Sequence, residues 1–280
     1  MPIVTTSGSH ATEIYYRDSK GPGRPIVFIH GWPASEASWN RVTPALQEAG
    51  YRIIAYDRRG FGRSGKPGSG FDYDTFASDL DQLLTRLDVV DAVLVGFSMG
   101  GGEVARYIAN HGTSRVTAAC FVGAITPCLD ATLADNPDGA FTPDAAAEMQ
   151  SGLLADPVGF LTGFLTNFYS IPTADGGTRL VVPEQQIASS IGIAQQANVN
   201  ALAACIPLWL TDFRADLAKL DIPTLVIHGE GDQIVPFAAS GARMPQFVKQ
   251  AIVRPLAFGP HGLLASHPDD VSSALLEFLA

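Results

Sequence analysis

The stretch that decides the fold reads Ala92-Val-Leu-Val-Gly-Phe-Ser-Met-Gly-Gly-Gly-Glu103. Its first four residues are apolar, which is typical of a strand that is buried on both faces. A glycine-rich turn follows, and Val104 and Ile108 then continue at helical spacing. The stretch therefore predicts a buried strand, a sharp turn and a helix, with Ser98 at the turn.

Apolar runs of similar length recur on both sides of this stretch and alternate with helical patterns. Helical spacing is clearest in Phe76, Leu80, Leu83, Leu84 and Leu87, and again in Val271, Leu275 and Phe278. The predicted strands cover residues 25–29, 51–56, 92–95, 116–122, 223–228 and 251–254. Strands that alternate with helices predict an α/β fold with a parallel sheet and helices on both faces.

The alternation stops between about Ile125 and Asp212. Seven prolines fall in this stretch, and its helical patterns have no clear strands between them. Phe160, Phe164 and Phe168 share one helical face. We expect residues 125–212 to form a helical cap subdomain, and residues 1–124 and 213–280 to form one α/β core.

The composition is that of a globular chain with an acidic surface. The 280 residues are 46% hydrophobic and 16% charged, and 28 acidic against 18 basic residues give a formal charge of −10. One α/β domain of this length is ordinary. An acidic surface repels phosphate groups, so neither nucleic acid nor an anionic membrane is an expected partner.

Cysteine content and apolar runs bear on the cellular compartment. Three cysteines, Cys120, Cys128 and Cys205, cannot all pair within the chain, and we expect free thiols in a reducing compartment. The first ten residues lack the pattern of a signal peptide. The longest apolar run, at residues 118–125, is too short to cross a bilayer. The prediction is a soluble, cytoplasmic protein.

The turn Gly96-Phe-Ser-Met-Gly100 matches the G-x-S-x-G nucleophile elbow, and it has the strand before it and the helix after it that this motif requires. Small neighbours leave room for the strained turn, and the helix N-terminus favours negative charge. Ser98 is therefore the candidate nucleophile. The alternative interpretation is a glycine-rich connection without chemistry.

Among the six histidines, His261 fits the role of general base best. A serine hydroxyl is a weak nucleophile until a base takes its proton. His261 lies in a loop between the last strand and the last helix, and such loops emerge where parallel sheets bind ligands. His228 is interpreted as a core histidine and His267 as a helix cap, and His30 ends the first buried strand.

An acid must hold the imidazole in its working tautomer. The loop Gly229-Glu-Gly-Asp-Gln-Ile-Val-Pro236 offers two candidates, Asp232 and Glu230. Asp57, after the second strand, is more remote, and we interpret it as a structural partner of Arg58 or Arg59.

An acyl-transfer site also needs backbone N–H donors for the oxyanion. One expected donor is Met99, the residue after the candidate nucleophile. The other lies in the loop after the first strand, where Gly31 allows a close approach and makes the Trp32 N–H the candidate. The Trp32 ring is equally well interpreted as an ordinary pocket wall.

One motif in the chain is similar to a dinucleotide-binding motif. Residues 60–65 match G-x-G-x-x-G, but the Lys-Pro-Gly sequence that follows breaks the helix that a dinucleotide site requires. No histidine pair or cysteine cluster has metal-ligand spacing. We therefore expect no nucleotide, no other cofactor and no metal.

Five motifs together resemble the cofactor-free bacterial haloperoxidases, also called non-haem chloroperoxidases, which are closely similar to bacterial aryl esterases and perhydrolases. The resemblance covers nearly all of the chain apart from the cap. A serine at position 98 separates the chain from haloalkane dehalogenases and epoxide hydrolases, which carry aspartate there. The motifs are His30-Gly-Trp-Pro33, Asp57-Arg-Arg-Gly-Phe-Gly-Arg-Ser64, Gly96-Phe-Ser-Met-Gly-Gly-Gly-Glu103, Gly231-Asp-Gln-Ile-Val-Pro236 and Pro260-His-Gly262.

This resemblance implies an α/β-hydrolase fold, with a mostly parallel eight-stranded sheet flanked by helices and a helical cap inserted late in the sheet. It implies hydrolysis of small aryl or alkyl esters through an acyl-enzyme, with Asp232 as the acid. It also implies perhydrolysis, in which hydrogen peroxide replaces water and releases a peracid that can oxidise halide. Such proteins often self-associate, so a homo-oligomer is an open expectation.

The resemblance also indicates a pocket. Phe160 and Phe164 resemble the family's aromatic acyl pocket, and Trp32, Pro33 and Ile234 are expected beside them. Pro33 looks like the perhydrolase form of its loop, whose carbonyl would position peroxide. The alternative for the aromatic stripe is simple cap core.

Two other functions stay open. The same catalytic groups would open a cyclic ester or amide, so a lactonase or γ-lactamase is the alternative enzyme. A non-catalytic receptor with this fold is a more remote alternative, because a receptor has no need of a nucleophile, a base and an acid together.

Overall fold

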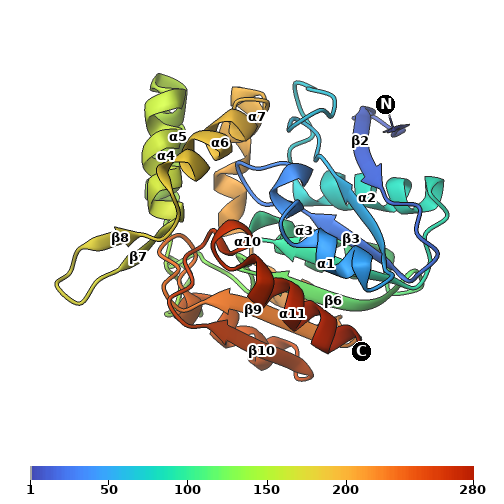
Figure 1. The fold of residues 1–280 in the computed structure, drawn as a ribbon. Coiled ribbons are helices and arrows are strands. Elements are labelled where there is room, and N and C mark those ends of the chain that lie inside the picture. The colour runs from blue at the N-terminus through green and yellow to red at the C-terminus, as the bar shows by residue number, and fades with distance from the viewer. Residues whose placement is uncertain (1) are drawn as a thin grey trace.

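Eight strands form one sheet in the order β1-β2-β4-β3-β5-β6-β9-β10 in the computed structural model, which describes residues 2–280 (Figure 1). The two pairs made by β2, with β1 and with β4, are antiparallel, and every other pair in this sheet is parallel. This arrangement confirms the predicted α/β-hydrolase fold. The strands are β1 (Ile3–Thr5), β2 (Glu13–Asp18), β3 (Pro25–Ile29), β4 (Arg52–Tyr56), β5 (Ala92–Phe97), β6 (Val116–Val122), β9 (Thr224–Gly229) and β10 (Ala251–Leu256).

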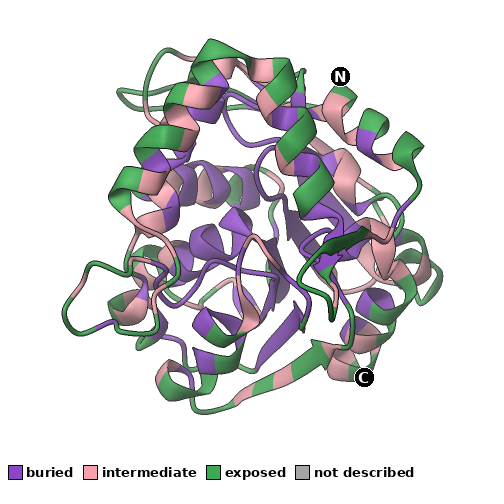
Figure 2. Cartoon of the chain, turned by 90° about the vertical axis from the view of Figure 1, so that its left-hand side faces the viewer, coloured by how far each residue is buried: buried purple, intermediate pink, exposed green. Residues whose placement is uncertain are grey.

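The central strands form because their side chains are apolar on both faces of the sheet. Along β5, Leu94 faces one hydrophobic cluster, whereas Val93 and Val95 face another. This alternation is the two-residue period of a strand, and here both faces find a core to pack against. Figure 2 shows the buried residues concentrated in the middle of the molecule.

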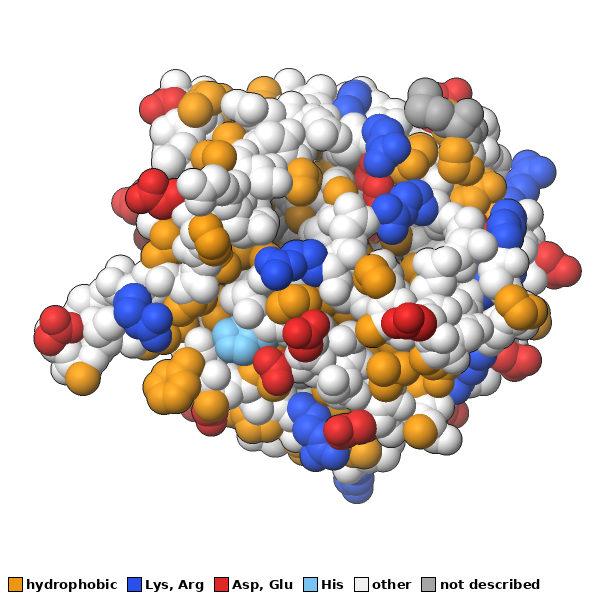
Figure 3. Space-filling view, in the orientation of Figure 1, with side chains coloured by type: hydrophobic (Ala, Val, Ile, Leu, Met, Phe, Trp, Pro, Cys, Tyr) orange, Lys and Arg blue, Asp and Glu red, His pale blue; other side chains and the backbone are white. Residues whose placement is uncertain are grey.

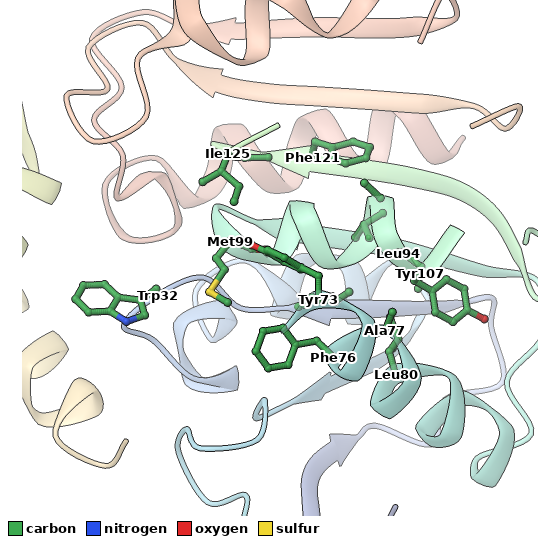
Figure 4. Close-up of a cluster of buried hydrophobic side chains, with 14 of the residues drawn as sticks. Trp32, Tyr73, Phe76, Ala77, Leu80, Leu94, Met99, Tyr107, Phe121 and Ile125 are labelled. Atoms are coloured by element: carbon green, nitrogen blue, oxygen red, sulfur yellow. The ribbon is translucent and has the colours of Figure 1, made fainter. Parts of the chain in front are cut away.

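Helices cover both faces of the sheet. In Figure 4, α2 and α3 carry Phe76, Leu80 and Tyr107 into the cluster that also holds Leu94 and Phe121. Helices α1 and α11 pack over the opposite face, with Leu46 and Leu275 in the second cluster. The core helices are η1 (Glu36–Trp39), α1 (Thr43–Glu48), α2 (Tyr73–Arg86), α3 (Met99–His111), η3 (Phe237–Ala239), η4 (Gly241–Arg243), α9 (Met244–Phe247), α10 (Leu263–Ser266) and α11 (Pro268–Leu279).

The chain between β6 and β9 is mostly helical, and its helices gather beside one end of the sheet (Figure 1). The prediction that this stretch holds no strands is wrong at one place, because β7 and β8 form a small antiparallel hairpin that projects from the body. Strands of three residues are too short to leave a readable alternation in the sequence. The elements are α4 (Pro143–Ala155), α5 (Pro157–Phe168), β7 (Ser170–Pro172), β8 (Thr178–Leu180), α6 (Glu184–Ala194), α7 (Val199–Cys205), η2 (Pro207–Leu210) and α8 (Arg214–Leu217).

Acidic, basic and hydrophobic side chains are interspersed on the face seen in Figure 3. Cys120, Cys128 and Cys205 are all buried and unpaired. Within residues 2–280, no helix combines the length and the apolar character needed to cross a bilayer.

The start of α2 offers a test of a local interaction. Asp72 caps this helix, because its Oδ1 accepts the Thr75 N–H at 2.8 Å. We expect Asp72→Ala to lower the free energy of unfolding by about 1 kcal/mol, or to lower Tm by about 2–4 °C at this chain size. Asp72→Asn, which keeps an oxygen acceptor, is the control. An equal loss in both variants would show that the cap hydrogen bond is not the cause.

Candidate active site

The loops that carry the candidate residues all leave the sheet at the carboxyl ends of its parallel strands. Ser98 directly follows β5, Asp232 lies in the loop after β9, and His261 lies in the loop after β10. Parallel strands end at a common edge, so three points far apart in the sequence meet there. This edge is also the one that adjoins the helices between β6 and β9 (Figure 1).

The backbone at Ser98 is strained, with φ of 52° and ψ of −119°. Its neighbours must be glycines because the chain crosses itself closely at this point. A Cβ on Gly96 would lie 2.4 Å from the Gly100 carbonyl oxygen, and a Cβ on Gly100 would lie 2.5 Å from that of Ile29. The turn predicted from the sequence is therefore present, and it presents the Ser98 hydroxyl at the sheet edge.

Ser98, His261 and Asp232 form a continuous hydrogen-bonded chain. The Nε2 atom of His261 lies 2.9 Å from Ser98 Oγ, and its Nδ1 atom lies 2.7 Å from Asp232 Oδ2. An ionised carboxylate only accepts hydrogen bonds, so Nδ1 carries the proton and Nε2 is free to accept from the serine. The rings of Phe97 and Phe168 pack against the imidazole, with centroids 5.2 and 4.8 Å away.

Asp232 is held in its charged form. Burial raises its pKa, but the attraction of His261 and the hydrogen bonds from His228 and His261 outweigh burial and place the pKa well below its ordinary value. Its second oxygen, Oδ1, accepts the N–H groups of Ile234 and Val235 at 2.9 and 2.8 Å. A buried carboxylate with this many donors is fixed in both charge and orientation.

The other candidate acids lie elsewhere. Glu230 is exposed. Asp57 is buried, but it accepts the backbone N–H groups of Glu36 and Arg63 at 2.8 and 2.7 Å. The expected partnership of Asp57 with Arg58 or Arg59 is not what the structure shows, because these guanidinium groups pair with Glu103 and Asp79 instead.

His228 is a core histidine, as expected, but it also touches the candidate acid. Its Nε2 atom lies 2.8 Å from the Val235 carbonyl oxygen and 3.3 Å from Asp232 Oδ2. This contact was not predicted from the sequence. The available signal was the four-residue spacing from Asp232 across a tight loop, which brings the two side chains to one point.

The two candidate oxyanion donors flank Ser98. A Cβ on Gly31 would lie only 2.8 Å from Ser98 Cβ, so the loop that carries the Trp32 N–H passes directly beside the serine. Met99 follows Ser98 at the start of α3. Among the described residues, neither the Trp32 N–H nor the Met99 N–H donates to a protein acceptor. Both buried donors are thus free to bind an oxygen atom.

A pocket of about 240 Å³ opens beside Ser98. Trp32, Phe164 and Ile234 line it as the sequence analysis expected, and no charged side chain is part of its lining. Trp209, which the sequence did not predict, also lines the pocket, and its ring packs edge-on against Trp32 with centroids 5.1 Å apart. The remaining lining residues are Ile125, Leu129, Ala140, Phe141, Met149, Asn167, Gln233, Val235 and Pro236.

Two expected pocket residues lie outside this lining. Pro33 borders a second cavity of about 250 Å³, between α6 and α10, because the loop turns away after Trp32. Phe160 lies one helical turn before Phe164, stacked on it and edge-on to Trp32, with centroids 6.2 and 6.4 Å away. Phe160 therefore supports the wall rather than forming it.

The glycine-rich segment at residues 60–65 closes on itself. The Gly60 N–H donates to the Gly65 carbonyl at 2.8 Å, and no helix begins until Tyr73. This geometry lacks the helix N-terminus that receives a pyrophosphate. Within residues 2–280, no three His, Cys, Asp or Glu side chains lie together in a way that could hold a metal ion.

Comparison with known proteins gives a consistent picture. A family model described as "alpha/beta hydrolase fold" matches residues 24–267. The chain is 40% identical to the non-heme chloroperoxidase CPO-A1 of Kitasatospora aureofaciens, over 100% of this chain and 99% of that protein. It is 32% identical to the bifunctional esterase/perhydrolase DCH of Acinetobacter calcoaceticus, with the same coverage. The crystal structure of a bromoperoxidase from Bacillus anthracis superimposes with a TM-score of 0.90 at 45% identity, covering 97% of this chain and 96% of that one.

The charge on Asp232 gives a test in two parts. Asp232→Asn would keep the shape but lose the acceptor that fixes the Nδ1–H tautomer, so we expect the rate of ester cleavage to fall by about 10⁴-fold. The measurement is kcat on a nitrophenyl ester. A loss below tenfold would contradict the assignment of Asp232.

The same variant tests the effect of pH on stability. The folded-state pKa of Asp232 is depressed, so its stabilising contribution is complete above its unfolded pKa of about 4 and is lost as pH falls from there towards the folded value. We therefore expect denaturant unfolding to show a stability gap between parent and Asp232→Asn at pH 7 that narrows below about pH 4. A stability difference between the parent and Asp232→Asn that increases as the pH falls would contradict this prediction.

Proposed function

We propose that this chain, which belongs to the alpha/beta hydrolase family, is a serine esterase that cleaves small, uncharged carboxylic esters through an acyl-enzyme at Ser98. The observation that carries the proposal is the hydrogen-bonded chain from Ser98 Oγ through His261 to Asp232, with distances of 2.9 and 2.7 Å. A base in contact with the nucleophile, and an acid that orients the base, are the requirements for acyl transfer.

The first half of the reaction forms the acyl-enzyme. Ser98 Oγ attacks the carbonyl carbon of the ester while its proton passes to Nε2 of His261. The resulting oxyanion accepts hydrogen bonds from the Trp32 and Met99 N–H groups, which have no protein acceptor among the described residues. The bond to the alcohol oxygen then breaks, and that oxygen takes the proton from His261.

The second half releases the acid. Water attacks the acyl carbon and gives its proton to His261, the bond to Ser98 Oγ breaks, and Oγ recovers the proton. Asp232 stays ionised throughout and stabilises the imidazolium that forms twice in each cycle. The depressed pKa of Asp232 supports this role, because the carboxylate does not compete for the proton.

The pocket beside Ser98 indicates the polarity and size of the acyl group that the substrate carries. Its walls are mostly apolar and aromatic, with Trp32, Phe164 and Trp209 as the largest side chains, and their described residues contain no charged group. Uncharged walls favour an apolar acyl chain or ring, because a charged group would lose its hydration without gaining an ion pair. A volume of about 240 Å³ suits a short or medium group.

Perhydrolysis is the second part of the proposal. Hydrogen peroxide attacks the acyl-enzyme in place of water, and the product is a peracid; a halide ion that reacts with the peracid gives hypohalous acid and the carboxylate. The named activities of the relatives support this, since one is a non-heme chloroperoxidase and another is a bifunctional esterase/perhydrolase.

The central test is Ser98→Ala on p-nitrophenyl acetate and butyrate. We expect the variant to lose at least about 10³-fold in kcat, because no other hydroxyl replaces the nucleophile. A fluorophosphonate should label the parent at Ser98 and leave the variant unlabelled. Ser151→Ala, an exposed serine on α4, is the matched control and should keep parental activity.

The substrate panel should also contain lactones and γ-lactams. A strong preference for a cyclic substrate that still depends on Ser98 would replace the esterase proposal with a lactonase or lactamase. Tight binding of an ester with no turnover by the parent would instead favour a receptor. Retained turnover in Ser98→Ala would remove the acyl-enzyme mechanism altogether.

Pro33 gives a separate test of perhydrolysis. The proline ring fixes φ and removes an N–H. Pro33→Leu would therefore relax the backbone of this loop, including the carbonyl that we propose positions peroxide. We expect the ratio of peracid formed to acid formed to fall in this variant, measured from one acyl donor at a fixed peroxide concentration. An unchanged ratio would exclude Pro33 from this role and leave the esterase proposal intact.

A further inference from the structure

A buried ion pair lies beneath the oxyanion donors and is used by no step of the reaction. Arg58 Nε donates to Glu103 Oε2 at 2.7 Å, and both side chains are almost completely inaccessible to solvent. The Tyr56 hydroxyl hydrogen-bonds the other carboxylate oxygen of Glu103. The rings of Phe61 and Phe76 enclose the guanidinium at 5.8 and 5.3 Å. Hydrogen bonds to both carboxylate oxygens and ring contacts to the guanidinium therefore hold the pair in place.

One end of this pair holds the loop that carries Trp32. Arg58 Nη2 donates to the His30 carbonyl at 2.9 Å, and the Arg58 backbone N–H donates to His30 Nε2 at 3.0 Å. His30 Nδ1 lies 2.7 Å from the Gly31 carbonyl oxygen. Burial and the charge of Arg58 lower the pKa of His30 well below its ordinary value, so the ring is neutral, with its proton on Nδ1.

The other end holds the helix that carries Met99. Glu103 lies four residues after Met99 on α3, which places both residues on one side of the first turn of the helix. In Figure 4, the Met99 side chain points into the cluster beside Tyr73 and Phe76. Arg58 thus bridges the two segments. It binds the His30 carbonyl, two residues before Trp32, and the Glu103 carboxylate, one helical turn after Met99.

We propose that the Arg58–Glu103 pair sets the spacing between the two oxyanion donors, so that Arg58 and Glu103 are positioning residues for the reaction. The proposal rests on the proposed function, because it concerns the same acyl transfer. A donor displaced by about 1 Å costs on the order of 100-fold in rate, so a rigid link between separate loops has a direct effect on catalysis.

Stability alone does not account for the pair. A buried ion pair is often no better for stability than apolar side chains of the same volume. Among the described residues, Arg58 Nη1 is buried without a hydrogen-bond partner, which is a further cost. The pair therefore carries a cost that packing alone does not explain.

The chain supplies its own control. Arg59 and Asp79 form a second buried ion pair, with Nη2 and Oδ1 2.6 Å apart. Arg59 also donates to the His10 carbonyl at 2.8 Å, so this pair ties α2 to the N-terminal segment. No hydrogen bond of Arg59 or Asp79, within residues 2–280, reaches residues 30–32. Both are buried arginine–carboxylate pairs, although Arg59 binds its carboxylate through two nitrogens and Arg58 through one, and they differ in the segments that they hold.

The experiment compares Arg58→Lys and Glu103→Gln with Arg59→Lys and Asp79→Asn. Lysine keeps the charge but lacks the fork that reaches a carboxylate and a carbonyl together. For each variant we would measure kcat and KM on p-nitrophenyl butyrate, the inhibition constant of an alkyl boronic acid that forms a tetrahedral adduct with Ser98, and Tm.

For Arg58→Lys we expect kcat to fall about 100-fold, with KM changed less than about threefold, because the lost interaction acts on the transition state and not on the ground state. The boronic acid should bind more weakly by a similar factor. Glu103→Gln should show the same pattern with a smaller loss. Arg59→Lys and Asp79→Asn should lower Tm while kcat and inhibitor affinity stay within about threefold of the parent.

Two results would overturn the proposal. One is parental kcat and boronic acid affinity in Arg58→Lys. The other is an equal loss in the Arg59 and Asp79 variants, which would mean that any disturbance of a buried pair lowers activity. If Arg58→Lys does not fold, Glu103→Gln decides by the same criteria. Failure of the esterase proposal is recognised separately, because the parent chain would then neither turn over the ester nor react with a fluorophosphonate.

Discussion

The sharp turn at Ser98 is the constraint on which the rest of the site depends. A side chain at positive φ costs on the order of 1–3 kcal/mol and persists only where the surrounding structure fixes the backbone. Here β5 is buried along its whole length, and α3 can begin directly after Ser98 because Gly96 and Gly100 allow the crossing. The core on both faces of the sheet therefore holds the hydroxyl in place before any substrate arrives.

The sequence predicted the parts of this structure that depend on local pattern. The central strands are apolar on both faces, and this pattern needs no knowledge of the neighbours. Ser98 and His261 could be singled out because each lies in a turn or loop after a recognisable strand, whereas the choice of Asp232 over Glu230 needed the resemblance of its loop to the family. Strand β1 has only three residues, and β2 has six but is only partly buried, so neither leaves a continuous apolar run. The β7–β8 hairpin was missed because each of its strands has only three residues.

The remaining features depend on distances that no local pattern encodes. Trp209 reaches the pocket from a short 3₁₀ helix far along the chain, and it meets Trp32 only because that segment folds back over the sheet edge. Pro33 is next to Trp32 in sequence, yet it faces a different cavity. The contact of His228 with Asp232 depends on a loop conformation that brings a strand residue and a loop residue together. Tertiary packing, rather than residue type, decided each of these cases.

The uncharged wall of the pocket has a consequence for turnover. In the proposed reaction, the ester enters this pocket as a neutral molecule, whereas the acid product ionises at neutral pH. A carboxylate in an apolar recess loses its hydration, and the described lining offers no cation to compensate for that loss. The exterior, with a formal charge of −10, also repels an anion that tries to return. On the proposed esterase function, hydrolysis would therefore convert a ligand that the pocket favours into one that it disfavours, so that release of the acid would need no conformational change.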